Sequence, residues 1–470
     1  MPSNSPKFSN KLNVSIPTVF RPPNKSPISC SESACLAYDQ YLRLPQLTKL
    51  CTSKNFPNWK DESLIKPALQ ALEITFRFVS IVLSDPRPYA NRREFKRRLE
   101  LLATSQIQLI ALLCEDDSTA PIVNLLTSNG VLARDGSFAE VWKIPGEEST
   151  IVNRTSESSL LPRLATWQKS EDMAQKILYT IESEMRRCPY TLGLGEPNMA
   201  GKPNLEYDAV CKPHELHALQ RNPYNHINNQ ENQILYTTHQ ILESWIFTSR
   251  ELLKRIAERI ENKEFDQASN DCYLLEQIWK LLAEIEDLHL LMDPDDFLRL
   301  KNQLSINSLH GSEPFCFRSR GLFEMTKVSK DLKHKVPIIL GVEVDPSGGP
   351  RVQEAAMRLY CEKKDFDKIH LLQSLQAIEA ALKKFFYAYK QVLVVVMGSL
   401  EAKASRVVVS AESSDSLTQI FLEPTYYPKA RMPDLSSKVT IAYVPVSLTT
   451  YFLNKCRVDT EKKAVEALCN

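Results

Sequence analysis

Three long segments with helical periodicity dominate the second half of the chain and limit what it can fold into. They cover residues 234–261, 265–291 and 353–391, and in each of them apolar side chains recur every three to four positions. Helices of this length bury their apolar faces most readily against one another, as in helical bundles. The sequence therefore predicts a mainly α protein whose C-terminal half is a helical bundle.

Helical periodicity also runs through much of the first half of the chain. Residues 36–50 are periodic, with a break or restart at Pro45. Residues 67–84 form a long apolar segment that ends at a Pro-rich stretch, and residues 92–114 and 171–187 are further amphipathic segments. We therefore expect helices throughout this half as well.

Changes in composition divide the chain into four parts. Residues 1–33 are polar and offer too little apolar surface to fold, so we expect a disordered arm. Residues 188–232 are rich in Pro, Gly and Asn, and we expect them to connect an N-terminal helical domain, residues 34–187, to a C-terminal domain, residues 233–470. The last seventy residues contain β-branched runs interrupted by Pro, which predict a small strand-bearing region.

The overall charge and the cysteines exclude several classes of protein. The chain has 58 basic and 57 acidic residues, a net charge of +1, which lacks the basic surplus of a nucleic-acid-binding protein. No run approaches the roughly 20 apolar residues that span a bilayer, and no signal-peptide core is present at the N-terminus. Eleven cysteines without CxxC pairs predict neither a disulfide framework nor a zinc site. We expect a cytoplasmic protein with access to the nucleus.

Residues 214–217 read His-Glu-Leu-His, which differs from the HExxH motif of zinc enzymes. The two histidines are three positions apart instead of four, and no third ligand accompanies them. We interpret this motif as a solvated helix start and predict no metal site.

His239 lies at the edge of the apolar stripe of the segment 234–261, and Glu243 lies one helical turn further along the same flank. Side chains at positions i and i+4 can hydrogen-bond, so we expect Glu243 to fix the tautomer of His239. Two interpretations stay open from these residues. His239 is either a histidine satisfied at a boundary between helices or part of a ligand pocket.

The surrounding residues favour the pocket through a resemblance. Residues 236–247, Tyr-Thr-Thr-His-Gln-Ile-Leu-Glu-Ser-Trp-Ile-Phe, are similar to the HQxxELWFK helix of the tryptophan 2,3-dioxygenase family. Residues 41–44 resemble the family's YLRL element, residues 292–298 its M-T-P-L-D-F-L element, and residues 315–318 its FQSLQFR element, whose Arg holds the substrate carboxylate. The resemblance implies a helical bundle with the indole 2,3-dioxygenase fold. It also implies an indole-type ligand pocket formed by His239, Gln240, Glu243, Trp245, Phe317 and Arg318.

The chain departs from that family at the position of the haem ligand. The family's proximal haem ligand is a His about nine residues before a Gly, and counting back from Gly398 leads to Tyr389. No His follows His370, and the family's GTGG loop is missing. Although a Tyr can ligate haem, a core aromatic residue is the favoured interpretation of Tyr389. We therefore expect no haem or other cofactor and no oxygen chemistry.

A second resemblance covers nearly the whole chain. Residues 64–76, 84–93, 160–166, 186–197 and 236–247 are similar to the plant HSPRO family, the nematode-resistance proteins first defined in beet. This resemblance implies a regulator of basal resistance and stress signalling. It also implies association with the βγ-type regulatory subunit of the plant energy-sensing, Snf-type kinase.

Two functions follow from these resemblances. The first is a non-catalytic regulator that acts through protein–protein contacts. The alternative is a sensor of a small indolic ligand, or a dioxygenase with or without haem, that uses the pocket around His239 and Arg318. The lack of a His at the proximal position favours the regulator.

Overall fold

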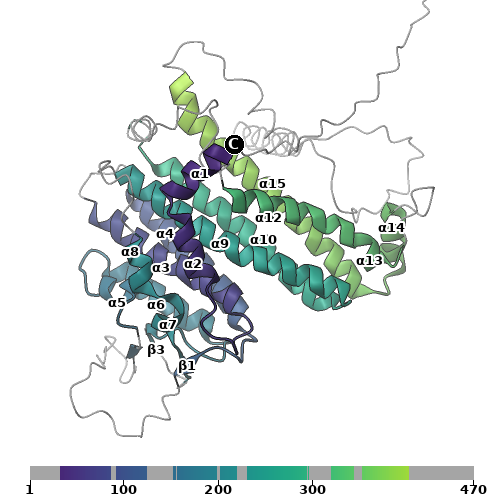
Figure 1. The fold of residues 1–470 in the computed structure, drawn as a ribbon, viewed down its shortest axis with the longest axis horizontal. Helices are drawn as coiled ribbons and strands as arrows, with labels where there is room; N and C mark the ends of the chain where they lie inside the picture. Colours follow the sequence, from purple (N-terminus) through teal and green to yellow (C-terminus); the bar gives the residue numbers. More distant parts are fainter. Residues whose placement is uncertain are drawn as a thin grey trace, which may run out of the picture.

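The structure, a computed structural model, describes residues 32–85, 92–123, 152–154, 156–197, 202–219, 230–293, 295, 319–342 and 352–401. Its helices are α1 (Glu32–Tyr41), α2 (Leu44–Thr52), α3 (Glu62–Ser84), α4 (Arg92–Cys114), α5 (Leu160–Leu164), α6 (Glu171–Met185), α7 (Tyr207–Cys211), α8 (Pro213–Ala218), α9 (Gln230–Glu261), α10 (Phe265–Asp287), α12 (Arg320–Asp331), α13 (Val336–Leu340), α14 (Val352–Glu362) and α15 (Phe366–Glu401). Two 3-10 turns, η1 (Leu288–Leu291) and η4 (Leu332–Lys335), extend α10 and α12. The prediction of a mainly helical protein is confirmed (Figure 1).

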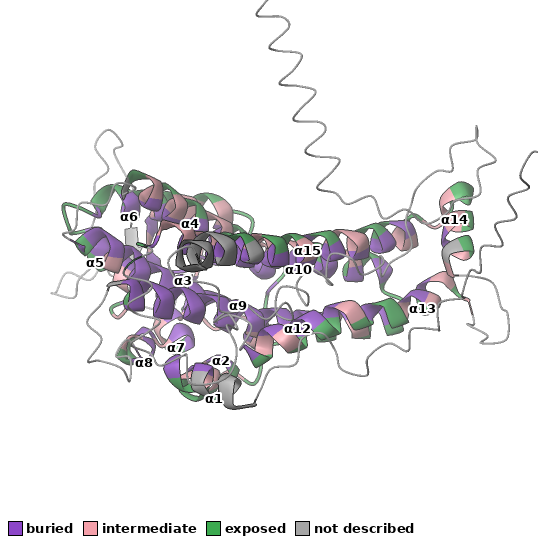
Figure 2. Ribbon diagram, turned by 90° about the horizontal axis from the view of Figure 1, so that it is seen from above, coloured by how far each residue is buried: buried purple, intermediate pink, exposed green. Residues whose placement is uncertain are grey.

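Helix α3 lies at the centre of the bundle, antiparallel to α9. The Thr248 hydroxyl of α9 donates to the Leu64 carbonyl, 3.0 Å away, near the start of α3, and Arg77 near its other end donates to Gln240. Helix α3 is long and apolar enough to cross a membrane, but 83% of that stretch is buried inside the protein, as in a core helix (Figure 2). It begins at Glu62, before the predicted start at Pro67.

Helices α4, α10 and α15 complete the bundle. Helix α4 runs antiparallel to α3, so that Gln106 meets Thr75 with a nitrogen-to-oxygen distance of 2.8 Å. Helix α10 folds back on α9, and α15 runs alongside α10 in the same direction. The hydroxyls of Ser269 and Ser374 are 2.9 Å apart at the start of that pair, and the rings of Trp279 and Phe385 are 5.5 Å apart further along it.

The segment 353–391, predicted as one helix, is two helices in the structure. Helix α14 ends at Glu362 and α15 begins at Phe366. Lys363 between them has a φ of 49°, a left-handed conformation that stops an α-helix. The segment 36–50 is also divided, as the sequence predicted, and Pro45 lies in the first turn of α2.

The predicted connection, residues 188–232, contains short regular elements. Strand β3 (Leu194–Pro197) pairs with β2 (Val152–Arg154), and β4 (Asn204–Leu205) pairs with β1 (Ile122–Val123); both pairs are antiparallel. Helices α7 and α8 follow, and Pro213 fits the first turn of α8, where a backbone N–H is not needed.

One hydrophobic cluster joins buried residues from Leu47 in α2 to Tyr389 in α15 and so draws on both predicted domains. The division between residues 34–187 and 233–470 stays a prediction. Of the predicted disordered arm, residues 1–33, the first 31 lie outside the described residues, whereas Glu32 and Ser33 belong to α1. Residues 402–470, which make up nearly all of the predicted strand-bearing region, also lie outside the described residues.

Candidate functional site

Four of the predicted pocket residues, His239, Gln240, Glu243 and Trp245, lie on α9 and are all buried. The other two, Phe317 and Arg318, lie outside the described residues. Because α9 is covered by other helices on most sides, even the polar residues at the edge of its apolar stripe are enclosed.

His239 is held between two rings. Its Nδ1–H donates to the Leu235 carbonyl at 2.9 Å, and its ring stacks on that of His289 with centroids 5.1 Å apart and planes 16° apart. Tyr38 of α1 packs edge-on against it at 5.8 Å. Burial, with a smaller effect of His289, lowers the pKa of His239 to about 4. The imidazole is therefore neutral at pH 7.

Glu243 bonds to two hydroxyls from distant segments. The Tyr38 hydroxyl donates to its carboxylate at 2.9 Å, and the Ser319 hydroxyl also bonds to it. Burial raises the pKa of Glu243 to about 7, and the two hydroxyls partly offset this rise. The sequence predicted that Glu243 would fix the tautomer of His239. In the structure, the Nδ1–H of His239 instead donates to the backbone carbonyl of Leu235, one turn earlier on α9.

Glu243 also meets α12 at a close approach. Ser319 caps α12, and a side chain on the neighbouring Gly321 would place its Cβ 2.9 Å from Cγ2 of Ile246 and 3.2 Å from Oε2 of Glu243. Glycine is needed here because it lets the start of α12 come within contact distance of α9.

Gln240 and Trp245 bond to helices of the first half. The Arg77 Nη2–H donates to the Gln240 side-chain oxygen, and the Gln240 amide donates to the Leu42 carbonyl at 3.2 Å. The Trp245 indole N–H donates to Gln106 of α4 at 3.0 Å. Each side chain therefore fastens α9 to another part of the bundle.

Sequence reasoning missed Arg77 and His289. Arg77 had a detectable signal, since Glu62, Lys66, Gln70, Glu73 and Arg77 recur every three or four positions in an otherwise apolar helix. His289 had none. It reaches α9 because α10 folds back along that helix, which places His289 Nε2 2.8 Å from the Thr238 hydroxyl and Nδ1 3.1 Å from Glu286.

Tyr389, the predicted former haem-ligand position, is buried on α15. It belongs to the same hydrophobic cluster as Phe385, Phe386 and Trp279. This packing is what the core-aromatic interpretation expects.

The His-Glu-Leu-His motif is only half solvated. His214 is exposed, but His217 is mostly buried, with Nε2 2.7 Å from a carboxylate oxygen of the fully buried Glu73. The prediction of a solvated helix start is therefore wrong for His217, because α8 packs against α3. Among the described residues, no group of three or more His, Cys, Asp or Glu side chains could hold a metal ion.

No solved structure matches the chain, so the indole-dioxygenase fold stays a prediction. The Hs1pro-1 N-terminus family matches residues 1–182, and the Hs1pro-1 protein C-terminus family matches residues 185–434.

Two proteins of Arabidopsis thaliana are similar over most of their length. Nematode resistance protein-like HSPRO2 is 57% identical over 428 residues, 90% of this chain and 92% of the relative. Nematode resistance protein-like HSPRO1 is 56% identical over 423 residues, 89% of this chain and 94% of the relative. This chain belongs to the Hs1pro-1 (HSPRO) family.

Proposed function

We propose that this protein regulates plant resistance and stress signalling by binding another protein. The two Arabidopsis relatives carry the name nematode resistance protein-like, and both cover nearly the whole chain. The partner we propose is the βγ-type regulatory subunit of the plant Snf-type kinase, and the proposed compartment is the cytoplasm with access to the nucleus.

The observation that carries a non-catalytic role is the bonding of the candidate site. On α9, Gln240, Glu243 and Trp245 bond to side chains from α3, α1 and α4, respectively. His239 is stacked on a neighbouring histidine. Because these side chains hold neighbouring helices together, their role here is structural. This supports a function that is carried out at the protein surface.

The partner is tested by titrating the purified full-length chain with the recombinant βγ subunit in a calorimeter. A saturable one-to-one complex is expected, and a regulatory subunit of an unrelated kinase serves as the control. Equal heats with both subunits, or none with either, would contradict the proposed partner.

The role in resistance is tested separately in plants that lack the protein. Nematode reproduction on these plants is expected to rise and to return to the wild-type level when the chain is re-expressed. Unchanged reproduction would count against a role in resistance.

A second candidate function is sensing of an indole-type ligand on a dioxygenase-like bundle. The observation that favours it is the group of buried titratable side chains on one side of α9, in which His239 stacks on His289 and His289 bonds to Glu286. Tryptophan is expected to raise the melting temperature of the protein if this function holds. A strong Soret band in protein from haem-supplemented cells would instead favour a dioxygenase over both non-catalytic functions.

A further inference from the structure

A stripe of buried polar side chains runs along α3, and its last member is Arg77. The stripe consists of Glu62, Lys66, Gln70, Glu73 and Arg77, all of which are buried. Transfer of a charged side chain into the interior is costly unless an opposite charge or several hydrogen bonds compensate it. Each charged member of the stripe is therefore expected to have compensating partners.

The first three charged members have such partners. Glu62 accepts from the backbone N–H groups of Asn55 and Phe56 at 2.8 and 3.0 Å. Lys66 donates to the Ser53 side chain at 3.0 Å and pairs with Glu62 at 3.5 Å. The Glu73 carboxylate lies within 2.7–2.9 Å of four groups, namely the Ser159 hydroxyl, the Leu160 N–H, the Tyr207 hydroxyl and the His217 ring.

Arg77 differs from the other members. Its side chain is 2% exposed, Nη2 donates to the neutral oxygen of Gln240, and Nη1 has no hydrogen-bond partner among the described residues. Burial lowers its pKa to about 10, so the guanidinium remains charged at pH 7. Glu73, one turn earlier, is already occupied by its four partners. Among the described residues, Arg77 is thus a buried cation to which no carboxylate bonds directly; Glu73 acts on it only through its charge, which raises the pKa of Arg77.

The surroundings of Arg77 combine an amide with an aromatic surface. Gln240 is fixed by its bond to the Leu42 carbonyl at 3.2 Å. Tyr236, which interacts with both Arg77 and Gln240, packs edge-on against Tyr41 with ring centroids 5.7 Å apart. A ligand here would meet a guanidinium and a carboxamide at one end and aromatic rings at the other.

We propose that Arg77, held in place by Gln240, binds the carboxylate of a small monocarboxylic acid with an apolar body. The carboxylate accepts the Nη1–H of Arg77 and places a negative charge in direct contact with the guanidinium. The apolar body lies against Tyr41 and Tyr236. This site is independent of the proposed protein partner and lies on a different flank of α9 from His239.

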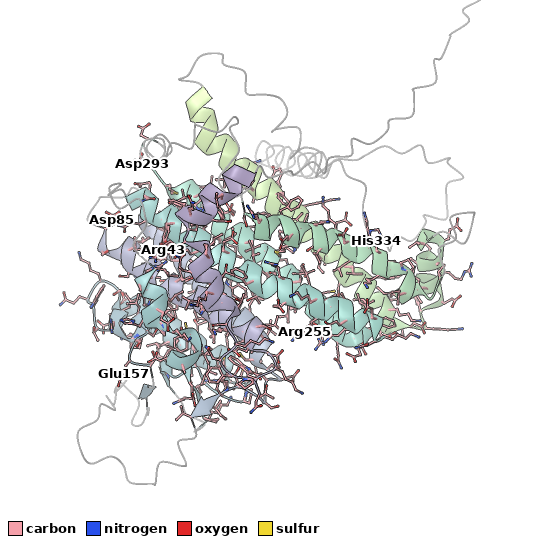
Figure 3. The ribbon with its side chains drawn as sticks, in the orientation of Figure 1. Arg43, Asp85, Glu157, Arg255, Asp293 and His334 are labelled. Carbon is pink, nitrogen blue, oxygen red and sulfur yellow. The ribbon has the colours of Figure 1, made fainter. Side chains whose placement is uncertain are left out.

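Helix α1, with Leu42 just after it, forms the cover of this site and lies on the outside of the bundle (Figures 1 and 2). Tyr38, Tyr41 and Leu42 pack with Tyr236 in a cluster separate from the main core. Polar contacts hold this cover, including Tyr41 to Asn232 at 2.7 Å and Arg43, labelled in Figure 3, to the Ala218 carbonyl at 3.3 Å. A small cover of this kind opens at a lower free energy than the main core, which gives the ligand a route of entry.

The experiment measures the melting temperature of the full-length chain with increasing benzoate. A concentration-dependent rise of a few degrees is expected. Benzamide, which has the same shape without the charge, is expected to produce no shift. No response to benzoate in the wild-type chain would overturn the proposal. So would an equal response to benzamide or to inorganic phosphate.

Substitutions at Arg77 test whether this residue binds the carboxylate. Arg77→Met is expected to abolish the benzoate response, whereas Lys66→Met, which removes a buried cation that already has partners, is expected to keep it. If Arg77→Met does not fold, Arg77→Lys keeps the charge but loses the fork geometry and is expected to weaken benzoate binding about tenfold, measured by calorimetry. Unchanged benzoate affinity in either Arg77 variant would contradict the assignment.

Discussion

Glu243 and His239 lie one helical turn apart on α9, and burial moves their pKa values in opposite directions. The pKa of Glu243 rises from 4.5 to about 7, and that of His239 falls from 6.5 to about 4. In both cases burial disfavours the charged form. The two groups therefore contribute opposite dependences of stability on pH across nearly the same range.

The contribution of Glu243 to the free energy of unfolding is fully present below pH 4.5 and is lost as the pH rises through about 7. The reason is that only the folded state keeps the proton in that range. Glu243→Gln removes this loss while keeping the side-chain shape. Relative to wild type, the stability of the variant is expected to rise with pH, by up to about 1.4 kcal/mol per pH unit. Urea unfolding between pH 5 and about 7 measures it. Parallel curves for the two proteins would contradict the raised pKa.

For His239 the dependence of stability on pH has the opposite sign. Its contribution to the free energy of unfolding is present above pH 6.5 and is lost as the pH falls through about 4, because the unfolded state binds the proton first. His239→Asn keeps a donor for the Leu235 carbonyl and removes the titration. The variant is expected to lose less stability than wild type on acidification, as measured by the same unfolding series. An identical acid loss in both proteins would show that His239 does not titrate in this way.

At the scale of the helices, close approaches and buried polar contacts set which elements meet. Helix α12 docks on α9 through Gly321, and the polar stripe of α3 attaches the segments that cover it. Apolar packing alone tolerates rotation of one helix on another, whereas a hydrogen bond has to be met at a fixed position. The polar stripe therefore fixes the register of the covering segments.

Gly321→Ala tests the docking of α12. The new Cβ would lie 2.9 Å from Cγ2 of Ile246, which is closer than a van der Waals contact. Because Cγ2 is bonded directly to the Ile246 Cβ, it has little freedom to move away. A loss of about 1–3 kcal/mol in the free energy of unfolding is expected. Adding Ile246→Ala removes the clash, so the double variant is expected to lose less than the sum of the single variants. Strict additivity in chemical denaturation would rule out this contact as the cause.

For the whole molecule, the main feature is one hydrophobic cluster that crosses the predicted domain boundary. Helix α3 comes from the predicted N-terminal domain and α9 from the C-terminal one, yet each covers the apolar face of the other. Residues that share one core unfold together.

The full-length chain is therefore expected to unfold in a single calorimetric transition for these helices, with equal calorimetric and van't Hoff enthalpies. A sharp test compares wild type with Trp245→Phe, which removes the bond between α9 and α4. In the variant, the whole unfolding transition is expected to shift to a lower temperature. Two separate transitions, of which only one moves, would favour independent domains.

Local patterns in the amino-acid sequence were enough to predict the helical character, most helix positions and the family. Apolar periodicity is a local property, so segments such as 92–114 and 234–261 could be located with small errors at their ends. A left-handed residue such as Lys363 carries no such signal, and the break after α14 was missed.

Which polar groups meet depends on how the helices pack in three dimensions. Arg77 and Gln240 are separated by 163 residues, and Tyr38 and Glu243 by 205. Whether a buried histidine or carboxylate is satisfied depends on which helix packs against it, and many packings satisfy the same apolar pattern. For this reason the sequence pointed to the helix around His239, and the packing of α1, α3 and α10 against it determined its partners.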